Sequence, residues 1–130
     1  MNEQIEIELK NLLNNRYSTS ESTRGNYARG EDTYDPILSK AVVFPESNEE
    51  VSKILKLCNE NKIPVIPFGT GTSLEGNVVG NEKGITISLE KMNKILSVNA
   101  EDFDCRVQAC VTKEQLNEYL REDGVFFPID

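Results

Sequence analysis

The 130-residue sequence contains neither histidine nor tryptophan. Without histidine, the usual imidazole general base and the usual imidazole metal ligand are both excluded. This absence argues against a self-contained hydrolase, and we expect no metal site in the chain. Aromatic residues make up only 7% of the sequence and the basic residues are scattered, so no stacking platform for single-stranded nucleic acid is visible.

Positive charge is also scarce, because 14 basic residues face 22 acidic ones and the net charge is −8. This excess argues against binding to nucleic acid or to an anionic membrane surface. No apolar run approaches the roughly 18–20 residues that a transmembrane helix needs. The three cysteines lack zinc-like spacing, and their odd number and the missing signal peptide predict a reducing cytoplasm. We expect a cytoplasmic protein, peripheral to a membrane only through a partner.

The apolar pattern of the first half predicts a helix, a connector and a strand–helix–strand unit. Residues 3–14 have apolar side chains at helical spacing, and residues 16–40 form a polar, irregular connector. Residues 41–45 predict a short buried strand. Ser47 then begins a capping box, in which Glu50 should reach back to the N-cap residue. With the next strand, this order predicts a right-handed βαβ unit.

The second half predicts further strands and one more helix. The strands are expected at residues 64–68, 84–89 (half-buried), 95–99, 103–109 and from 125 onward. A second capping box from Thr112 to Gln115 begins a helix that should end at Gly124. Packing explains Cys58 on a helix core face and Cys105 on an apolar strand face. The expected fold class is α/β (α+β), a small mixed sheet with flanking helices.

One stretch, residues 67–77, carries the chemistry, and we name it the glycine loop. It holds three glycines in eight residues, with hydroxyl side chains between them. Glycine permits positive φ and the close approach of another molecule, and rows of backbone N–H groups bind phosphate oxygens. The stretch is therefore either a diphosphate cradle or a mobile loop after a buried strand. Neither common glycine fingerprint is present, because no lysine follows and Gly69, Gly71 and Gly76 are spaced two and then five.

The segment Pro-Val-Ile-Pro-Phe-Gly-Thr-Gly-Thr-Ser-Leu-Glu-Gly, residues 64–76, resembles a known phosphate-binding loop. It is that of FAD-linked oxidoreductases of the vanillyl-alcohol oxidase and p-cresol methylhydroxylase type, most similar to the D-lactate dehydrogenase and glycolate oxidase flavin-subunit branch. Further segments resemble the same family in the same order, at residues 41–45, 92–95, 98–104, 111–117 and 126–130.

The resemblance implies a domain organisation. In that family two α/β lobes clasp FAD, and a separate cap domain covers the isoalloxazine and holds the substrate. Residues 40–130 would be the first half of such a PCMH-type FAD-binding domain, truncated, and residues 1–39 would be an N-terminal helix and an irregular connector. No catalytic residue is expected, because the substrate and catalytic regions of the family have no counterpart in this sequence.

The resemblance also implies which residues bind FAD. Residues 69–73 should donate to the diphosphate, and their neighbours should shape the loop. The complete set is Pro67, Phe68, Gly69, Thr70, Gly71, Thr72, Ser73, Leu74, Gly76, Asn77, Pro128 and Asp130.

The sequence departs from the family pattern at two places. Asn77 stands where this branch most often has histidine, which affects flavin tuning, although the amide can still donate a hydrogen bond. Ala109 and Cys110 replace a usual Pro-Gly, and a positive φ there would cost about 1 kcal/mol. Cys110 is then either a redox-sensitive thiol near the flavin or a product of drift at a turn.

Three functions are compatible with these observations. The chain could be the FAD-binding portion of a flavin-dependent D-lactate or glycolate dehydrogenase, with a separate chain supplying the second FAD lobe and the substrate cap. It could instead be a truncated, non-catalytic remnant that no longer binds FAD. A third alternative is an independent module that uses the glycine loop for another diphosphate ligand.

Overall fold

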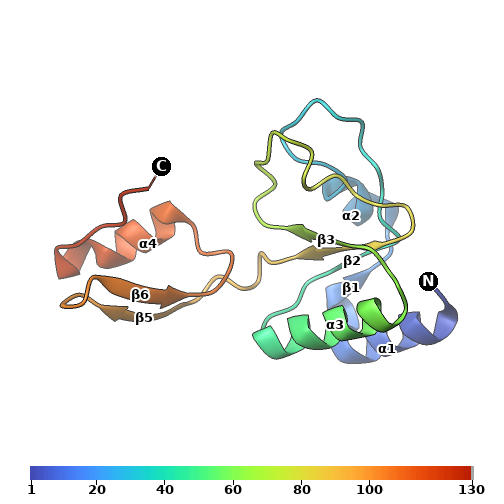
Figure 1. Cartoon of the computed structure of the whole chain (residues 1–130), viewed down its shortest axis with the longest axis horizontal. Coiled ribbons are helices and arrows are strands. Elements are labelled where there is room, and N and C mark those ends of the chain that lie inside the picture. The colour runs from blue at the N-terminus through green and yellow to red at the C-terminus, as the bar shows by residue number, and fades with distance from the viewer. Residues whose placement is uncertain (130) are drawn as a thin grey trace. The chain divides into compact units, whose positions relative to one another are not determined.

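The computed structural model describes residues 1–129, and the chain divides after Lys91 into two compact units (Figure 1). Both units combine helices with strands, so the predicted α/β class is confirmed. The boundary between residues 39 and 40 that the resemblance implies stays a prediction. Each unit is described by itself below.

The first unit is built on a four-stranded sheet. Its elements are α1 (Glu3–Leu13), η1 (Asn14–Arg16), β1 (Tyr17–Ser18), α2 (Glu21–Asn26), β2 (Ala41–Val43), α3 (Asn48–Glu60), β3 (Val65–Phe68) and β4 (Ile85–Ser88). The strand order is β1-β2-β4-β3, with β4 parallel to both neighbours and β1 antiparallel at one edge. β2, α3 and β3 form the predicted strand–helix–strand sequence, and β4 lies between its two strands.

The prediction that residues 84–89 are half-buried is wrong, because every residue of β4 is buried. A strand with a parallel neighbour on each side is covered on both faces in an α/β sheet. Ile85 and Ile87 belong to the apolar core, whereas the Thr86 hydroxyl lies 2.8 Å from the Ser39 hydroxyl. This contact gives the Thr86 hydroxyl a hydrogen-bond partner on the polar face of β4. The alternation of apolar and polar residues along β4 therefore distinguishes two buried faces, rather than a buried face from an exposed one.

The connector predicted at residues 16–40 is more ordered than its composition indicates. Tyr17 and Ser18 pair with β2, and α2 follows with Ser20 as its N-cap, whose hydroxyl accepts the N–H of Thr23. A two-residue strand has no periodicity to detect. It forms because β2 offers it a free edge.

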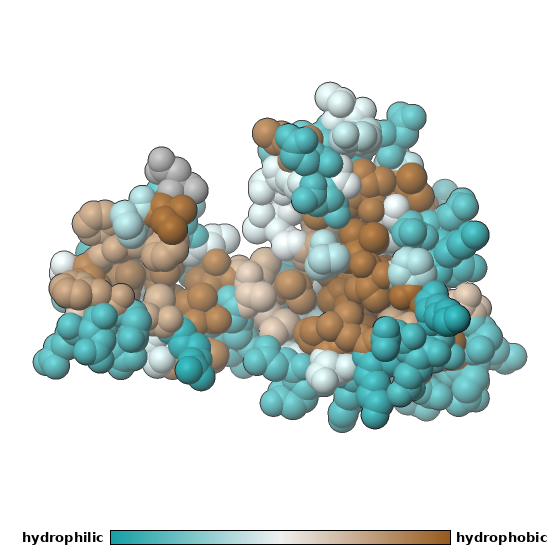
Figure 2. Space-filling view, in the orientation of Figure 1, coloured by the Kyte–Doolittle hydropathy of each residue, from teal (hydrophilic) through white to brown (hydrophobic). Residues whose placement is uncertain are grey.

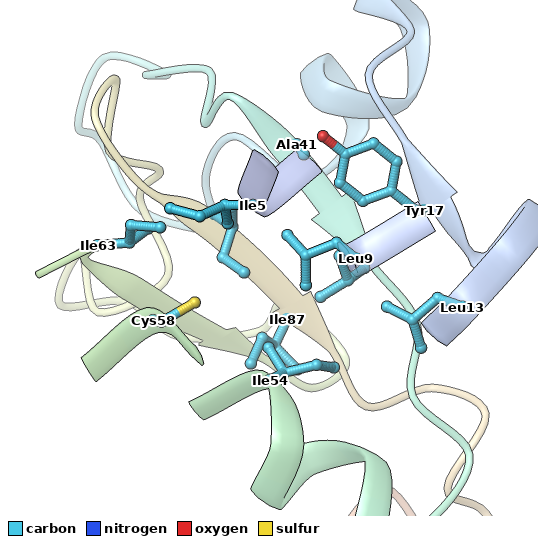
Figure 3. Packing of buried hydrophobic residues seen from close by; sticks show 11 residues of the cluster. Ile5, Leu9, Leu13, Tyr17, Ala41, Ile54, Cys58, Ile63 and Ile87 are labelled. Atoms are coloured by element: carbon cyan, nitrogen blue, oxygen red, sulfur yellow. The ribbon is translucent and has the colours of Figure 1, made fainter. Parts of the chain in front are cut away.

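The core of the first unit lies where α1 and α3 cover the sheet (Figure 3). Ile5, Leu9 and Leu13 of α1 converge with Ile54 and Cys58 of α3. Burial raises the pKa of the Cys58 thiol. The prediction that packing explains Cys58 is therefore confirmed.

The first capping box differs from the predicted one. The Ser47 hydroxyl accepts the N–H of Glu50 at 3.2 Å, as expected. The Glu50 carboxylate instead accepts a hydrogen bond from the Glu46 N–H at 2.8 Å. It also accepts hydrogen bonds from the two terminal guanidinium nitrogens of Arg16, each at 2.6 Å. A bidentate guanidinium is a stronger partner than one backbone N–H, so it determines where the carboxylate lies.

Glu50→Gln should destabilise the protein by about 1 kcal/mol at pH 7. The hydrogen bonds from Arg16 lower the pKa of Glu50 below its ordinary 4.5, so the pair stabilises the fold above that value. This contribution is lost as the pH falls through the folded-state pKa. Urea unfolding should therefore show a difference from wild type at pH 7 that shrinks toward pH 3. An equally large difference at both pH values, or an equal effect of Glu49→Gln on the exposed side of α3, would contradict this assignment.

The second unit contains β5 (Ile95–Asn99), β6 (Asp104–Val107), α4 (Lys113–Leu120) and η2 (Arg121–Asp123). β5 and β6 form an antiparallel hairpin. Thr112 caps α4 by accepting the N–H of Gln115 at 3.1 Å, while the Gln115 amide donates to the Asn93 carbonyl at 2.7 Å rather than back to Thr112. Gly124 ends the helical segment with a φ of 70°, as predicted.

Two predictions for the second unit are wrong. No strand begins at residue 125 within the part of the chain described, because the side chain of Asn117 takes the place of a neighbouring strand. It donates to the Phe127 carbonyl at 3.2 Å and accepts the Phe127 N–H at 2.7 Å. All residues of β6 are exposed, so packing does not explain Cys105. Across residues 1–129, no helix has the length and apolar character that crossing a bilayer requires.

Candidate functional site

The glycine loop leaves the carboxyl end of β3 and leads toward β4, the end at which open parallel sheets bind ligands (Figure 1). Phe68 is buried beneath the loop, whereas Gly69, Thr70 and Thr72 are exposed. The sequence therefore turns abruptly from a strand into a solvent-facing, hydroxyl-rich segment.

Two glycines of the loop are required by the fold itself. Gly71 has a φ of 75°, and a Cβ there would lie 2.6 Å from the Phe68 ring. Gly76 has a φ of 76°, and its Cβ would lie 2.9 Å from the Tyr34 ring. Gly69 differs, because its φ is not positive and a Cβ would meet nothing within 4 Å. The chain alone gives no reason for glycine at position 69.

The backbone amides of the loop are available for a ligand. Within residues 1–129, Glu75 is the one member of the stretch 69–77 whose N–H donates a hydrogen bond, to the Ser73 hydroxyl at 3.4 Å. The Thr70 and Thr72 hydroxyls lie 3.4 Å apart. Backbone donors without protein partners, next to hydroxyl donors, fit the phosphate oxygens of a nucleotide.

An aromatic cluster supports the loop from below. The Tyr27 ring makes edge contacts with Phe68 at 5.0 Å and with Phe44 at 5.5 Å between ring centroids. The Tyr27 hydroxyl donates to the Glu90 carboxylate, and burial, with a smaller contribution from Glu90, raises the pKa of Tyr27 to about 12. Sequence reasoning missed Tyr27 because it lies in the segment predicted as a connector.

The second unit has a hollow of its own, with a volume of about 290 Å³. It is mostly apolar and includes Val98, Phe103, Leu116 and Phe127 among its lining residues. This hollow lies between the β5–β6 hairpin, α4 and the segment that follows α4.

The predicted cofactor residues are divided between the two units. Pro67 and Phe68 end β3 of the first unit, those from Gly69 to Asn77 lie in the loop that follows it, and Pro128 is an exposed residue of the second unit. Asp130 lies outside the described residues. All of these assignments stay predictions.

The turn at Ala109 and Cys110 needs no positive φ, so the strain that a positive φ would cause there does not arise. The non-glycine residues with positive φ in the described chain are Asn14, Lys62 and Phe103. The Val111 N–H donates to the Gln108 carbonyl at 3.2 Å, which closes the turn over Ala109 and Cys110 without a left-handed residue. The replacement of Pro-Gly is therefore compatible with this backbone.

Comparison with known proteins identifies the family. Residues 39–130 match the family model described as FAD binding domain. The chain belongs to this family. The resemblance predicted from the glycine loop is confirmed, and FAD is the cofactor of the family.

Curated relatives of this family member are oxidoreductases. It is 42% identical over 113 residues to a probable mitochondrial D-lactate dehydrogenase of Danio rerio, covering 87% of this chain and 23% of that protein. It is 38% identical to the mitochondrial D-lactate dehydrogenase [cytochrome] of Arabidopsis thaliana, covering 95% and 22%. It is 33% identical to the glycolate oxidase subunit GlcD of Bacillus subtilis, covering 69% and 19%. The chain thus spans about a fifth of the length of these relatives.

Solved structures confirm the fold. An alkyldihydroxyacetonephosphate synthase superimposes with a TM-score of 0.90 at 24% identity, covering 100% of this chain and 27% of that one. A p-cresol methylhydroxylase superimposes with a TM-score of 0.78 at 23% identity, covering 93% and 24%. The FAD-binding family member therefore has the PCMH-type fold that the sequence predicted.

Proposed function

We propose that this chain is the FAD-binding portion of a flavin-dependent 2-hydroxy-acid dehydrogenase that acts on D-lactate or glycolate. The glycine loop holds the FAD diphosphate. The observation that carries this proposal is that, within residues 1–129, no amide of residues 69–77 other than that of Glu75 donates to a protein acceptor, and that the loop lies at the carboxyl end of parallel strands. The D-lactate dehydrogenases and the glycolate oxidase subunit among the relatives support the substrate class.

This chain positions the cofactor. The amides of residues 69–73 and the hydroxyls of Thr70, Thr72 and Ser73 donate hydrogen bonds to the phosphate oxygens. When bound, FAD supplies the acceptor for the hydride that leaves the substrate. These donors are neutral, so they hold the diphosphate through oriented dipoles, and the catalytic acid–base groups come from outside this chain.

We also propose that a separate chain supplies the second FAD lobe and the substrate cap. The second unit exposes large apolar side chains, with Phe103 84%, Phe126 74% and Tyr119 58% accessible. Brown and tan atoms spread over the second unit in Figure 2. A surface of this kind is typical of an interaction site. The alternative is a remnant that no longer binds FAD, and Asn77, which stands where the resembled branch most often has histidine, favours it.

Titration with FAD tests this function directly. We expect quenching of flavin fluorescence and a rise in unfolding temperature, since ligand at a hundred times its dissociation constant stabilises a protein by about 2.7 kcal/mol. If neither effect is seen, whether or not a larger flavoprotein fragment is co-expressed, the chain is a remnant that no longer binds FAD. ADP-ribose and CoA serve as competitors. If either displaces FAD or binds more tightly than FAD, the chain is an independent nucleotide-binding module.

A further inference from the structure

A segment outside the matched family region lies against the glycine loop. Residues 28–34, which we name the N-terminal wall, precede the family match that begins at residue 39. Figure 1 shows the blue-to-cyan chain before β2 next to the yellow-green chain after β3. The Gly80 N–H donates to the Ala28 carbonyl at 2.9 Å, which ties the start of the wall to the chain just beyond the loop.

Gly30 makes the tightest approach between the wall and the loop. A Cβ at Gly30 would lie 2.8 Å from the Ser73 carbonyl oxygen and 3.0 Å from the Gly71 carbonyl oxygen. Both are backbone atoms; the 2.8 Å approach is closer than a Cβ tolerates, and the 3.0 Å approach is tighter than most Cβ contacts. The backbone of residues 71–73 therefore lies where it does because position 30 has no side chain.

Tyr34 makes the second approach, and its own position is fixed within the wall. Its ring lies against Gly76, because a Cβ built on Gly76 would be 2.9 Å from two carbons of the Tyr34 ring. The Asp32 carboxyl accepts the Tyr34 N–H at 3.0 Å, and the Arg29 guanidinium donates to the Tyr34 carbonyl at 3.0 Å. The Asp32 contact is an Asx turn, in which a side chain replaces a backbone acceptor.

The wall is not built for stability alone. The second carboxyl oxygen of Asp32, Oδ2, is buried and has no donor among the described residues. A buried oxygen without a donor is unfavourable, because it has lost its hydrogen bonds to water and gained none from the protein. Such a cost is common where the geometry of a segment serves a binding site.

We propose that the N-terminal wall positions the glycine loop for the FAD diphosphate, with Gly30, Asp32 and Tyr34 as positioning residues. Gly30 and Tyr34 contact the two halves of the loop, at residues 71–73 and at Gly76, and Asp32 holds Tyr34. This inference rests on the proposed function and extends its site to a segment that the family match does not include.

The first test compares Gly30→Ala with Gly25→Ala. A Cβ at Gly25 would meet nothing within 4 Å, so the same change five residues earlier is a matched control. In the ligand-free protein, Gly30→Ala should accelerate hydrogen exchange at Val79 and Gly80, whose N–H groups donate to the Gly76 and Ala28 carbonyls, with β2 and α3 unchanged. It should also weaken FAD binding at least tenfold, and Gly25→Ala should do neither. Wild-type exchange at Val79 and Gly80 in Gly30→Ala would overturn the proposal.

The second test uses the Asx turn. Asp32→Asn keeps an oxygen that can accept the Tyr34 N–H, whereas Asp32→Ala removes it. Asp32→Ala should accelerate exchange at Val79 and Gly80 and weaken FAD binding, and Asp32→Asn should restore both. If Ala and Asn behave alike, Asp32 does not act through the turn and its positioning role is overturned.

The two proposals fail in distinguishable ways. Wild-type protein that binds no FAD contradicts the proposed function, while the exchange measurements still decide whether the wall holds the loop. If wild type and Gly30→Ala bind FAD with equal affinity, the positioning role of the N-terminal wall is contradicted. The proposed function is unaffected by that result.

Discussion

Gly69→Ala is expected to weaken FAD binding at least tenfold without lowering the unfolding temperature of the ligand-free protein. Position 69 has an ordinary backbone conformation and open space around a Cβ, so alanine costs the fold nothing. In the proposed complex, that open space is where the diphosphate approaches the backbone. A methyl group there separates the phosphate oxygens from the amides, and a tenfold loss corresponds to about 1.4 kcal/mol.

Gly71→Ala provides the contrast to Gly69→Ala. Its positive φ and the nearby Phe68 ring mean that alanine costs about 1–2 kcal/mol in the ligand-free protein. Isothermal titration with FAD and thermal unfolding without it should therefore show a loss of binding alone for Gly69→Ala and a loss of both for Gly71→Ala. Tight FAD binding by Gly69→Ala would contradict close approach at this position.

Ile5→Ala should destabilise the protein by about 2–5 kcal/mol, the usual cost of emptying a buried aliphatic site. Ile5 is 4% exposed and packs into the core with Leu9 and Leu13 of the same helix (Figure 3). Because α1 precedes the region that matches the family, a large effect would mean that the FAD-binding unit depends on residues outside that match.

Ile7→Ala is the matched control for Ile5→Ala. It makes the same change two residues away on α1, at a side chain that is 44% exposed. Urea unfolding should give a difference from wild type below about 1 kcal/mol for Ile7→Ala. Equal effects of the two variants would show that α1 does not pack as described.

The sequence predicted the elements whose causes are local. The helix start at Ser47 follows from a cap residue and an apolar spacing within a few positions, and so does the one at Thr112. The glycine loop was recognisable because its glycines and hydroxyls occupy one short stretch. Its family assignment is confirmed, whereas the role of each of its residues stays a prediction.

Features that depend on distant partners were not predictable. β1 exists because β2 offers an edge, and β4 is buried on both faces because parallel strands flank it. Glu50 turns to Arg16, 34 residues away, rather than to its own helix cap. The wall at Gly30 and Tyr34 was missed because its order comes from contacts with residues 71–76, which composition does not report.

The position of β4 in the sheet also sets the order in which the first unit can be completed. β2 and β3 are not hydrogen-bonded to each other. Each pairs with β4, which is the last strand of the first unit to be synthesised. Until residues 85–88 leave the ribosome, two aliphatic strands have unpaired inner edges, and such edges invite aggregation. Nascent chains that stall within the glycine loop should therefore be the ones that most need a chaperone.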